Sequence, residues 1–468
     1  MESKKAARFS VLVINGSPKG SNSSTMQYVR YISKQLPKHH FETVHVAKNI
    51  ELLKKDRNEF NSLMQKFQNA DAVLFGFGVW VIGVSSQLMS FIETVTHGPY
   101  AACLKNKPVA VISTSIHYYD HLAHQYMRAV CEDLHMRFID GLSLDIADLH
   151  NSDIRKIMRQ FAQNFADSIN NGYESPKQFA ELPRSTFTYQ SGHITRSIKI
   201  GQSNRVLILT DADSHCQNET AMVLRLRSVF KGGTISVYHL SDIPMTQGCR
   251  GCMRCGYDYS CVYQDGFTEF YNGTAMEADI LIFCGTVRGR YLSPRWKMFF
   301  DRAFFWNHTP SLAGKQIGYL ISGPLRQNPH LVETLEVTVT ARQNANFVGI
   351  VTDEDHDSAH LDKLIDDFAH KAATLSSMHF VAPQNFLAVG GQKIFRDEIW
   401  GRLRAIWQAD YRFYKRHGMF DFPHRKRLFR FAGFLAMLFS HLPFFRKRFY
   451  NLLAKSPPML VRIVDRHP

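Results

Sequence analysis

The sequence lacks several features that would place a chain in a class at once. Residues 1–8 are polar and lack the apolar stretch of a secretory signal. The apolar run 431–445 is interrupted by polar residues and is shorter than the roughly 20 residues that span a bilayer. No recognised nucleic-acid module is present. We therefore expect a cytoplasmic protein that binds no nucleic acid and whose clustered cysteines serve metal or redox chemistry rather than disulfides.

Size and composition indicate several folded domains. At 468 residues the chain exceeds what one hydrophobic core usually supports, and 45% apolar content excludes a disordered protein. The net charge of +15 is uneven, because residues 380–468 hold 17 Lys and Arg against 5 Asp and Glu. The apolar run 431–445 lies between the basic triplets 425–427 and 446–448. Two alternatives remain open for it: packing on the protein body or a partner subunit, or peripheral attachment to anionic lipid on the inner face of the membrane.

Short apolar runs alternate with segments of helical length. Strands are expected at 9–14, 43–46, 72–76, 109–114 and 138–142, and after a polar, turn-rich stretch again at 205–210, 234–239, 279–285, 316–322 and 346–351. Such alternation predicts parallel sheets covered by helices on both faces. The predicted organisation is a first domain (1–172), a linker (173–203), a second domain (204–380) and a basic, mostly helical C-terminal extension (381–468).

The two predicted domains contain the same passage twice. Residues 70–79 recur as 278–287, an offset of 208, whereas Thr25 pairs with Thr220 at an offset of 195. The difference of 13 residues equals the length of the cysteine-rich stretch 249–261. The pattern predicts a tandem duplication that a cysteine loop has made asymmetric.

The first strand is followed by a loop suited to one phosphate. Residues 17–25 offer hydroxyls, an amide, an ammonium group and backbone N–H groups where a strand meets a helix. The N-terminus of a helix carries partial positive charge and binds phosphate. The loop has neither the dinucleotide glycine fingerprint nor the lysine-bearing P-loop. An ordinary capped turn is the alternative.

The residues Gly-Ser-Pro-Lys at 16–19, Ser-Asn-Ser at 21–23 and Ala-Asp-Ala-Val at 70–73 resemble the flavodoxin-like NADPH-dependent FMN reductase family, over roughly residues 8–380. The resemblance implies two tandem flavodoxin-like, doubly wound, five-stranded parallel sheets. The residues that it implies for the FMN phosphate are Ser17, Lys19, Ser21, Asn22 and Ser23. The residues that it implies for the isoalloxazine ring are Phe77, Gly78, Val79, Trp80, Thr114, Ser115 and His117. Core packing is the alternative for 77–81, where the family's usual proline and tyrosine are absent.

The corresponding loop of the second copy is acidic. Residues 210–220 lack the glycine, proline and lysine of the first loop and contain Asp211, Asp213 and Glu219. Carboxylates around a phosphate dianion repel it unless they are paired or turned away. We expect the second copy to bind FMN poorly or not at all.

The cysteine loop has the spacing of a four-sulfur centre. Cys249, Cys252, Cys255 and Cys261 follow the pattern C-x2-C-x2-C-x5-C, which suits an iron–sulfur cluster or tetrahedral zinc. The spacing is similar to that of the iron–sulfur flavoproteins and implies a 4Fe-4S cluster near a flavin. Zinc and free thiols or a reversible disulfide remain open. Further along, Lys297, Asp301 and Arg302 are expected to form helix-face ion pairs with a neighbouring strand; the family's use of this segment in a flavin pocket is the alternative.

The resemblance implies an FMN-dependent NAD(P)H oxidoreductase. Electrons would pass from a nicotinamide nucleotide through FMN to an iron–sulfur cluster or an external acceptor, and the residues identify no catalytic acid. A homo-oligomer is also expected. Two alternatives stay open: a non-enzymatic flavodoxin-like electron carrier, and a membrane-docked scaffold whose second domain is stabilised by zinc or thiols.

Overall fold

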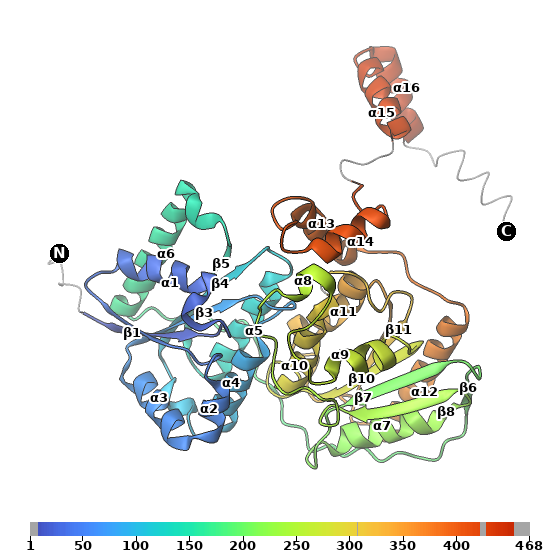
Figure 1. Ribbon diagram of the computed structural model, residues 1–468, viewed down its shortest axis with the longest axis horizontal. Coiled ribbons are helices and arrows are strands. Elements are labelled where there is room, and N and C mark those ends of the chain that lie inside the picture. The colour runs from blue at the N-terminus through green and yellow to red at the C-terminus, as the bar shows by residue number, and fades with distance from the viewer. Residues whose placement is uncertain (1–7, 307, 422–426, 454–468) are drawn as a thin grey trace. The chain divides into compact units, whose positions relative to one another are not determined.

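The computed structural model describes residues 8–306, 308–421 and 427–453 (Figure 1). The chain divides into two compact units, Met1–Arg412 and Phe413–Pro468. The first unit contains two five-stranded parallel sheets with helices on both faces. No described helix is both long and apolar enough to cross a membrane.

The first sheet has the strand order β2-β1-β3-β4-β5. Its strands are β1 (Ser10–Asn15), β2 (His40–Val44), β3 (Ala72–Gly78), β4 (Pro108–Ser115) and β5 (Arg137–Asp145). Its helices are α1 (Ser24–Gln35), α2 (Ile50–Lys55), α3 (Arg57–Asn69), α4 (Ser86–His97), α5 (Asp120–Asp133) and α6 (Ser152–Asn171). Helices α1 and α6 cover one face and the others lie on the opposite face (Figure 1). Alternate residues of β1, such as Val13 and Ile14, enter the two core clusters.

The second sheet repeats this order as β9-β7-β10-β11-β12. Its strands are β7 (Arg205–Thr210), β9 (Thr234–His239), β10 (Ile280–Thr286), β11 (Gln316–Ser322) and β12 (Asn346–Thr352). Its main helices are α7 (Gln217–Val229), α10 (Pro294–Arg302), α11 (Pro329–Gln343) and α12 (Ser358–Ser377), with the short α8 (Cys255–Asp258), α9 (Phe267–Phe270), η4 (Tyr271–Ala275) and η5 (Ala303–Trp306). The order of both sheets is that of flavodoxin, which confirms the predicted fold class.

The two sheets keep the offsets of the sequence repeat. Strand β7 begins 195 residues after β1, and β10 begins 208 residues after β3. Helices α4 and α10 pack against each other, and one apolar core cluster contains residues of both domains. The tandem duplication itself stays a prediction, but the two halves share one architecture and one core.

The segment between the sheets is an ordered arm. Apart from β6 (Ile198–Lys199), which pairs with β8 (Phe230–Lys231), it has no helix or strand between residues 173 and 204. Tyr189 is buried and its hydroxyl donates to Asp362 at 2.5 Å, while Gly192 N donates to the same carboxylate at 2.9 Å. The arm is therefore fastened to the second domain.

The C-terminal region is helical, as expected. It forms α13 (Phe386–Trp400), α14 (Gln408–Arg416), α15 (Arg427–Phe439) and α16 (Pro443–Leu453). Helix α13 packs against α11, and Arg402 forms an ion pair with Asp145. The division after Arg412 separates the segment 381–412, which belongs to the unit with both sheets, from the rest of the predicted extension. The predicted domain boundaries remain predictions.

Candidate functional site

Three loops meet at the carboxyl ends of adjacent strands in the first sheet. They follow β1, β3 and β4, which are neighbours in the strand order. In an open α/β sheet, ligands bind at this edge, where the strand order reverses. These loops, together with the last residues of β3 and β4, contain all the residues that were expected to hold FMN.

The first loop is shaped by Asn15, the last residue of β1. Its buried side chain donates from Nδ2 to Gly20 O at 2.9 Å and accepts at Oδ1 from Ser17 N at 3.0 Å. Gly20 takes a left-handed φ of +59°, which favours glycine. Asn15 thus curls the backbone that begins α1. The sequence-based site missed it, although an asparagine ending an apolar strand directly before a glycine is a visible signal.

Several donors of this loop have no structural use in the described protein. Ser23 is the N-cap residue of α1, is only 4% exposed, and its side chain makes no capping hydrogen bond. The first N–H groups of a helix have no partner within the helix. Lys19, Ser21 and Asn22 are exposed around it. Ser17 Oγ accepts from Lys19 N at 3.3 Å, which helps to hold the loop and does not use the O–H donor of Ser17. These unclaimed donors fit the phosphate group of FMN.

The second loop contains a strained turn. Trp80 N donates to Gly83 O at 2.7 Å, and between them Val81 and Ile82 have φ values of 44° and 67°. Bulky β-branched residues rarely adopt positive φ. Strain of this kind concentrates at functional sites, where the surrounding structure maintains it. Here the second domain does so, because Lys297 Nζ donates to Trp80 O at 2.8 Å.

Lys297 belongs to a fully buried ion pair. It pairs with Asp301, one turn further along α10, and Asp301 accepts from Ser86 N at 2.9 Å at the start of α4. Burial lowers the pKa of Lys297 and raises that of Asp301, and their mutual attraction opposes both shifts. The expected helix pair is present, but it fastens the second domain to the first instead of facing a strand. Spacing alone cannot show a partner from the other domain.

The side chains of the second loop divide between core and site. Phe77 is fully buried and packs near His124, so only its backbone faces the loops. Val79 N donates to Thr114 O at 3.0 Å. Trp80 packs against Phe304 of the second domain at 4.8 Å, and its buried indole N–H has no hydrogen-bond partner in the described protein. That donor lies close to the Cys249 thiol and acts to lower its pKa, against the larger effect of burial.

The third loop is linked to the first by a hydroxyl pair. Thr114 Oγ1 lies 2.6 Å from Thr25 Oγ1 at the start of α1. Ser115 Oγ accepts from His117 N at 2.9 Å, and the exposed His117 ring lies 2.8 Å from Asp120. Burial acts to raise the pKa of Asp120, but hydrogen bonds outweigh it and hold that pKa below its ordinary value. His117 is thus oriented at the mouth of the loops.

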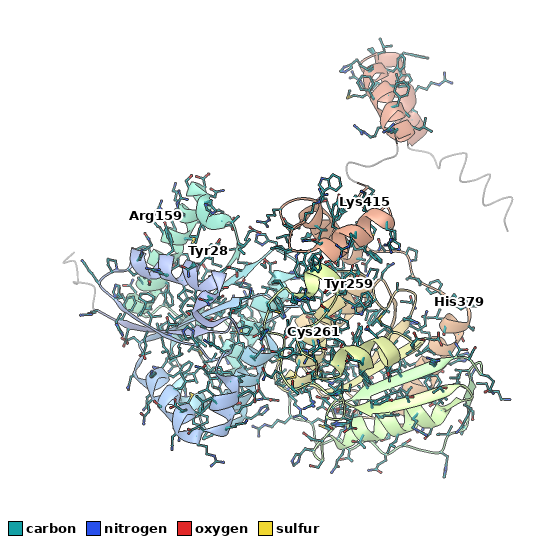
Figure 2. The ribbon with its side chains drawn as sticks, in the orientation of Figure 1. Tyr28, Arg159, Tyr259, Cys261, His379 and Lys415 are labelled. Carbon is teal, nitrogen blue, oxygen red and sulfur yellow. The ribbon has the colours of Figure 1, made fainter. Side chains whose placement is uncertain are left out.

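The cysteine loop lies over the first two loops. Gly251 has a φ of +67°, and a Cβ added there would lie 3.2 Å from Lys19 Cε and 3.5 Å from Trp80 Cη2. Gln87 Nε2 of α4 donates to Cys249 O at 3.1 Å. Cys261 marks the end of the loop in Figure 2. The structure therefore brings the thiols of one domain to the ligand loops of the other.

Arg302 clamps the base of the cysteine loop. Its guanidinium pairs with Asp265 in a bidentate contact of 2.8 and 2.7 Å and donates to Gln247 O at 3.0 Å. Asp265 also accepts from Thr246 N at 3.1 Å, so both ends of the loop are joined. Burial acts to raise the pKa of Asp265, but the guanidinium holds it well below its ordinary value. The expected ion pair of Arg302 thus forms with a loop instead of a strand.

The four thiols lie near one another. Burial raises the pKa of Cys249 to about 12. Burial also raises the pKa of Cys255, and the charges of Cys249, Cys252 and Cys261 raise it further. Among the residues that the structure describes, no group of three or more His, Cys, Asp and Glu has the arrangement of a metal site. The side chains as placed do not fit a cluster or zinc without rearrangement.

In the second domain, the acidic loop is paired internally. Buried Glu219 accepts from Thr210 Oγ1 at 2.5 Å and from Thr286 Oγ1 at 2.8 Å. Burial, then the charge of Asp211, raise the pKa of Glu219 to about 7. Asp213 forms an ion pair with Arg288 at 2.6 Å. The loop after β7 thus presents carboxylates at the position where the loop after β1 presents hydrogen-bond donors.

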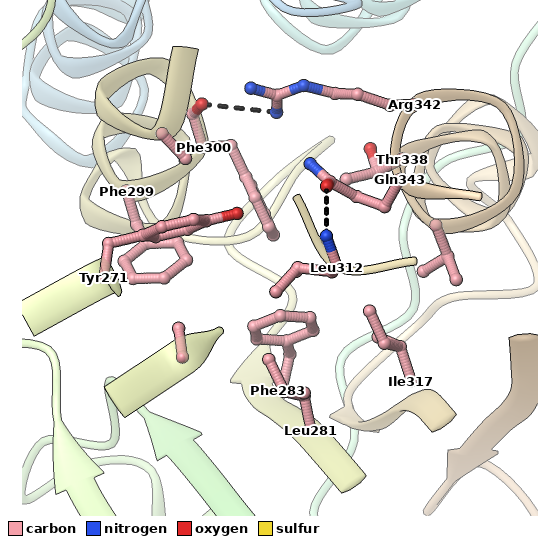
Figure 3. Close-up of a pocket in the computed structure, with 13 residues that line it drawn as sticks. Tyr271, Leu281, Phe283, Phe299, Phe300, Leu312, Ile317, Thr338, Arg342 and Gln343 are labelled. Carbon is pink, nitrogen blue, oxygen red and sulfur yellow. Dashed lines mark hydrogen bonds between the residues drawn. The ribbon is translucent and has the colours of Figure 1, made fainter. Parts of the chain in front are cut away.

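A small hollow lies in the core of the second domain (Figure 3). Its volume is about 20 Å³, and Arg342 lies above it, donating to Phe300 O at 3.4 Å. A space of this size holds about one water molecule. It is part of the domain core and cannot hold a cofactor.

Comparison with known proteins gave a family match for the first domain. A family model described as NADPH-dependent FMN reductase matches residues 9–148. Comparison with curated proteins gave no significant match.

Three solved structures are similar over about a third of the chain. The apo form of an NADH:FMN oxidoreductase (EMOB) shares 19% identity with a TM-score of 0.30, covering 34% of this chain and 89% of that one. An FMN-dependent NADH-azoreductase from Bacillus anthracis shares 12% identity with a TM-score of 0.29, covering 35% of this chain and 100% of that one. The flavoenzyme NAD(P)H:(acceptor) oxidoreductase from Paracoccus denitrificans shares 18% identity with a TM-score of 0.27, covering 35% of this chain and 98% of that one. Residues 9–148 of this chain thus match the NADPH-dependent FMN reductase family, which confirms the resemblance for the first domain, while its extension to the second domain stays a prediction.

Proposed function

We propose that the protein is an FMN-dependent NAD(P)H oxidoreductase whose first domain holds the flavin. The observation that carries this proposal is the set of unclaimed donors around Ser23 at the start of α1. These donors lie within the segment 9–148 that matches the FMN reductase family. A helix N-terminus with free N–H and hydroxyl groups is an anion site.

Each loop has its own part in this proposal. The residues that would hold the phosphate are Ser17, Lys19, Ser21, Asn22 and Ser23. Asn15 keeps their backbone curled. The other two loops supply the ring contacts from the backbone of Gly78 and Val79, from Trp80, and from Thr114, Ser115 and His117. When bound, FMN supplies hydride acceptance from a nicotinamide and one-electron release. The protein binds, orients and shields it.

The second domain closes the site and supplies the nearest candidate acceptor. Its cysteine loop contacts Lys19 and Trp80, and its Lys297 holds the strained turn. A 4Fe-4S cluster, zinc or an external acceptor remain proposals for the destination of the electrons. The thiols as placed do not form a metal site, so the reaction is not routed through a metal. Measuring iron and zinc in anaerobically purified protein distinguishes the cluster, zinc and an external acceptor.

Turnover distinguishes this function from its runner-up. Protein loaded with FMN should oxidise NADH or NADPH catalytically in the presence of an artificial acceptor such as ferricyanide. A non-enzymatic electron carrier would accept electrons from a chemical reductant but would not turn over with either nucleotide. Failure to bind FMN at all would contradict both readings and leave the scaffold alternative.

For the second unit we propose attachment to an anionic membrane surface. Helices α15 and α16 expose large apolar side chains, among them Phe431, Phe434 and Phe444 at 61%, 51% and 78%. Exposed Arg446, Lys447 and Arg448 lie on the same short hairpin. Apolar side chains beside cations are the composition of an interfacial segment on anionic lipid.

A further inference from the structure

A cavity of about 270 Å³ lies between the two domains, apart from the proposed flavin site. The first domain lines it with residues of α2 and α4, and the second with the acidic loop and the start of α10. This volume holds a small organic molecule rather than a bare ion.

Two residues that line this cavity each contain a buried polar atom with no hydrogen-bond partner in the described protein. Asp211 is 7% exposed, and its Oδ1 accepts from Trp296 Nε1 at 2.8 Å. The Ser293 side chain lies close enough to act on the pKa of Asp211, but Oδ2 has no hydrogen bond of good geometry. Ser90 of α4 is 5% exposed, and its hydroxyl is also unpartnered. An unsatisfied buried polar group costs free energy, and a bound ligand that satisfies it removes this cost. The two groups come from different domains and line one cavity.

The charge of the cavity wall favours a cation. Glu93 lines it beside Asp211, and the exposed Glu51 and Lys54 add one charge of each sign to the wall. Burial raises the pKa of Asp211 and of Glu93, and the charge of Arg288 opposes both shifts.

The nearby arginines have other partners. Arg288 pairs with Asp213 at 2.6 Å, and Arg295 Nε donates to Leu240 O at 2.9 Å. The buried wall therefore has acceptors in excess of donors. Among the described residues, no group has the arrangement of a metal site, which argues against a divalent ion.

We propose that this cavity binds a small organic molecule that carries an ammonium or amidinium group. The cationic group lies between Asp211 and Glu93, with the Ser90 hydroxyl as an additional acceptor. The organic body occupies the space towards Met298 and Ile50. The second copy of the flavin site thus serves as a receptor for a cationic ligand.

The test compares a cation with its neutral counterpart on the full chain. Binding of benzylamine and of benzyl alcohol is measured by calorimetry, and benzylamine should bind about tenfold more tightly or better, as a charge-assisted hydrogen bond predicts. Asp211→Asn keeps an oxygen for Trp296 but removes the charge, so this preference should disappear. Glu59→Gln, at an exposed acid of α3, is the matched control and should retain it.

A second variant covers the case in which Asp211→Asn fails to fold. Ser90→Leu fills the cavity from the other domain and should abolish benzylamine binding, with thermal unfolding as the check on folding. Flavin content of both variants should equal that of the wild type, which separates this proposal from the proposed function. Equal affinity for benzylamine and benzyl alcohol, no binding of either at millimolar concentration, or unchanged benzylamine binding by Ser90→Leu would overturn it.

Discussion

Single residues give the two equivalent loops opposite chemistry. Asn15 folds the first loop so that its donors stay unused, whereas Glu219 occupies the second with a buried carboxyl group. The sequence predicted the acidity of the second loop correctly, because charges are visible in a sequence. It could not predict the role of Asn15, because that role depends on two hydrogen bonds that only the folded loop forms.

The pKa of Glu219 predicts how stability depends on pH. Burial raises it from 4.5 to about 7, so the folded protein keeps this proton where the unfolded chain has released it. Stability should therefore fall as the pH rises from about 4.5 to 7, by about 3 kcal/mol from this residue. Glu219→Gln should remove that part of the dependence in urea unfolding at pH 5 and pH 8, and Glu59→Gln should not. An unchanged profile in Glu219→Gln would show that the carboxyl group titrates normally.

At the scale of elements, the core strands could be predicted, whereas the bounds of a polar strand and a helix without an apolar stripe could not. Strands β7 and β9 have the predicted bounds, because each is a short run rich in β-branched residues. Strand β2 begins three residues before its prediction, since this half-exposed strand is polar. Helix α11 was not predicted, because it is buried around much of its circumference and shows little helical periodicity.

The link between α10 and the first domain predicts a large effect from one buried lysine. Lys297→Met leaves Asp301 buried without its partner and should lower the free energy of unfolding by about 3–5 kcal/mol. The double variant Lys297→Met/Asp301→Leu should recover most of this loss, because it removes both charges.

Lys363→Met is the control for this measurement. Lys363 and Asp367 form the same i,i+4 pair on α12, but both are exposed, so the change should be below about 1 kcal/mol. Denaturant unfolding measures all three variants. A loss at Lys297 as small as that at Lys363 would show that the pair does not hold the domains together.

The second unit predicts a lipid preference. The full chain should sediment with phosphatidylserine vesicles, should bind phosphatidylcholine vesicles less, and should be released by salt. Phe434→Glu and Phe444→Glu should each weaken binding about tenfold or more, since a buried phenylalanine contributes about 1.5–3 kcal/mol. Phe386→Glu changes a phenylalanine of α13 that is 85% exposed and serves as the control. Equal binding to both lipids in every variant would contradict membrane attachment through this hairpin.

At the scale of the whole molecule, the asymmetry between the domains was predictable, but the contact between them was not. Cysteine spacing and the repeat offsets identified the loop 249–261 and its place in the second copy. Gly251 against Lys19 and Trp80, and Lys297 against Trp80, are contacts across domains. Such contacts leave no periodic signal in one sequence. The cavity at Asp211 was hidden for the same reason.

The number of flavins bound per chain tests most directly whether the first domain alone binds FMN. We predict one FMN per chain in the reconstituted wild type, strongly reduced binding in Lys19→Ala/Ser23→Ala, and unchanged binding in Asp213→Asn of the second loop. Absorbance of released flavin against protein concentration gives the ratio. Two flavins per chain, or one flavin that survives the change at Lys19 and Ser23 but is lost from the second loop variant, would contradict the assignment of FMN to the first domain.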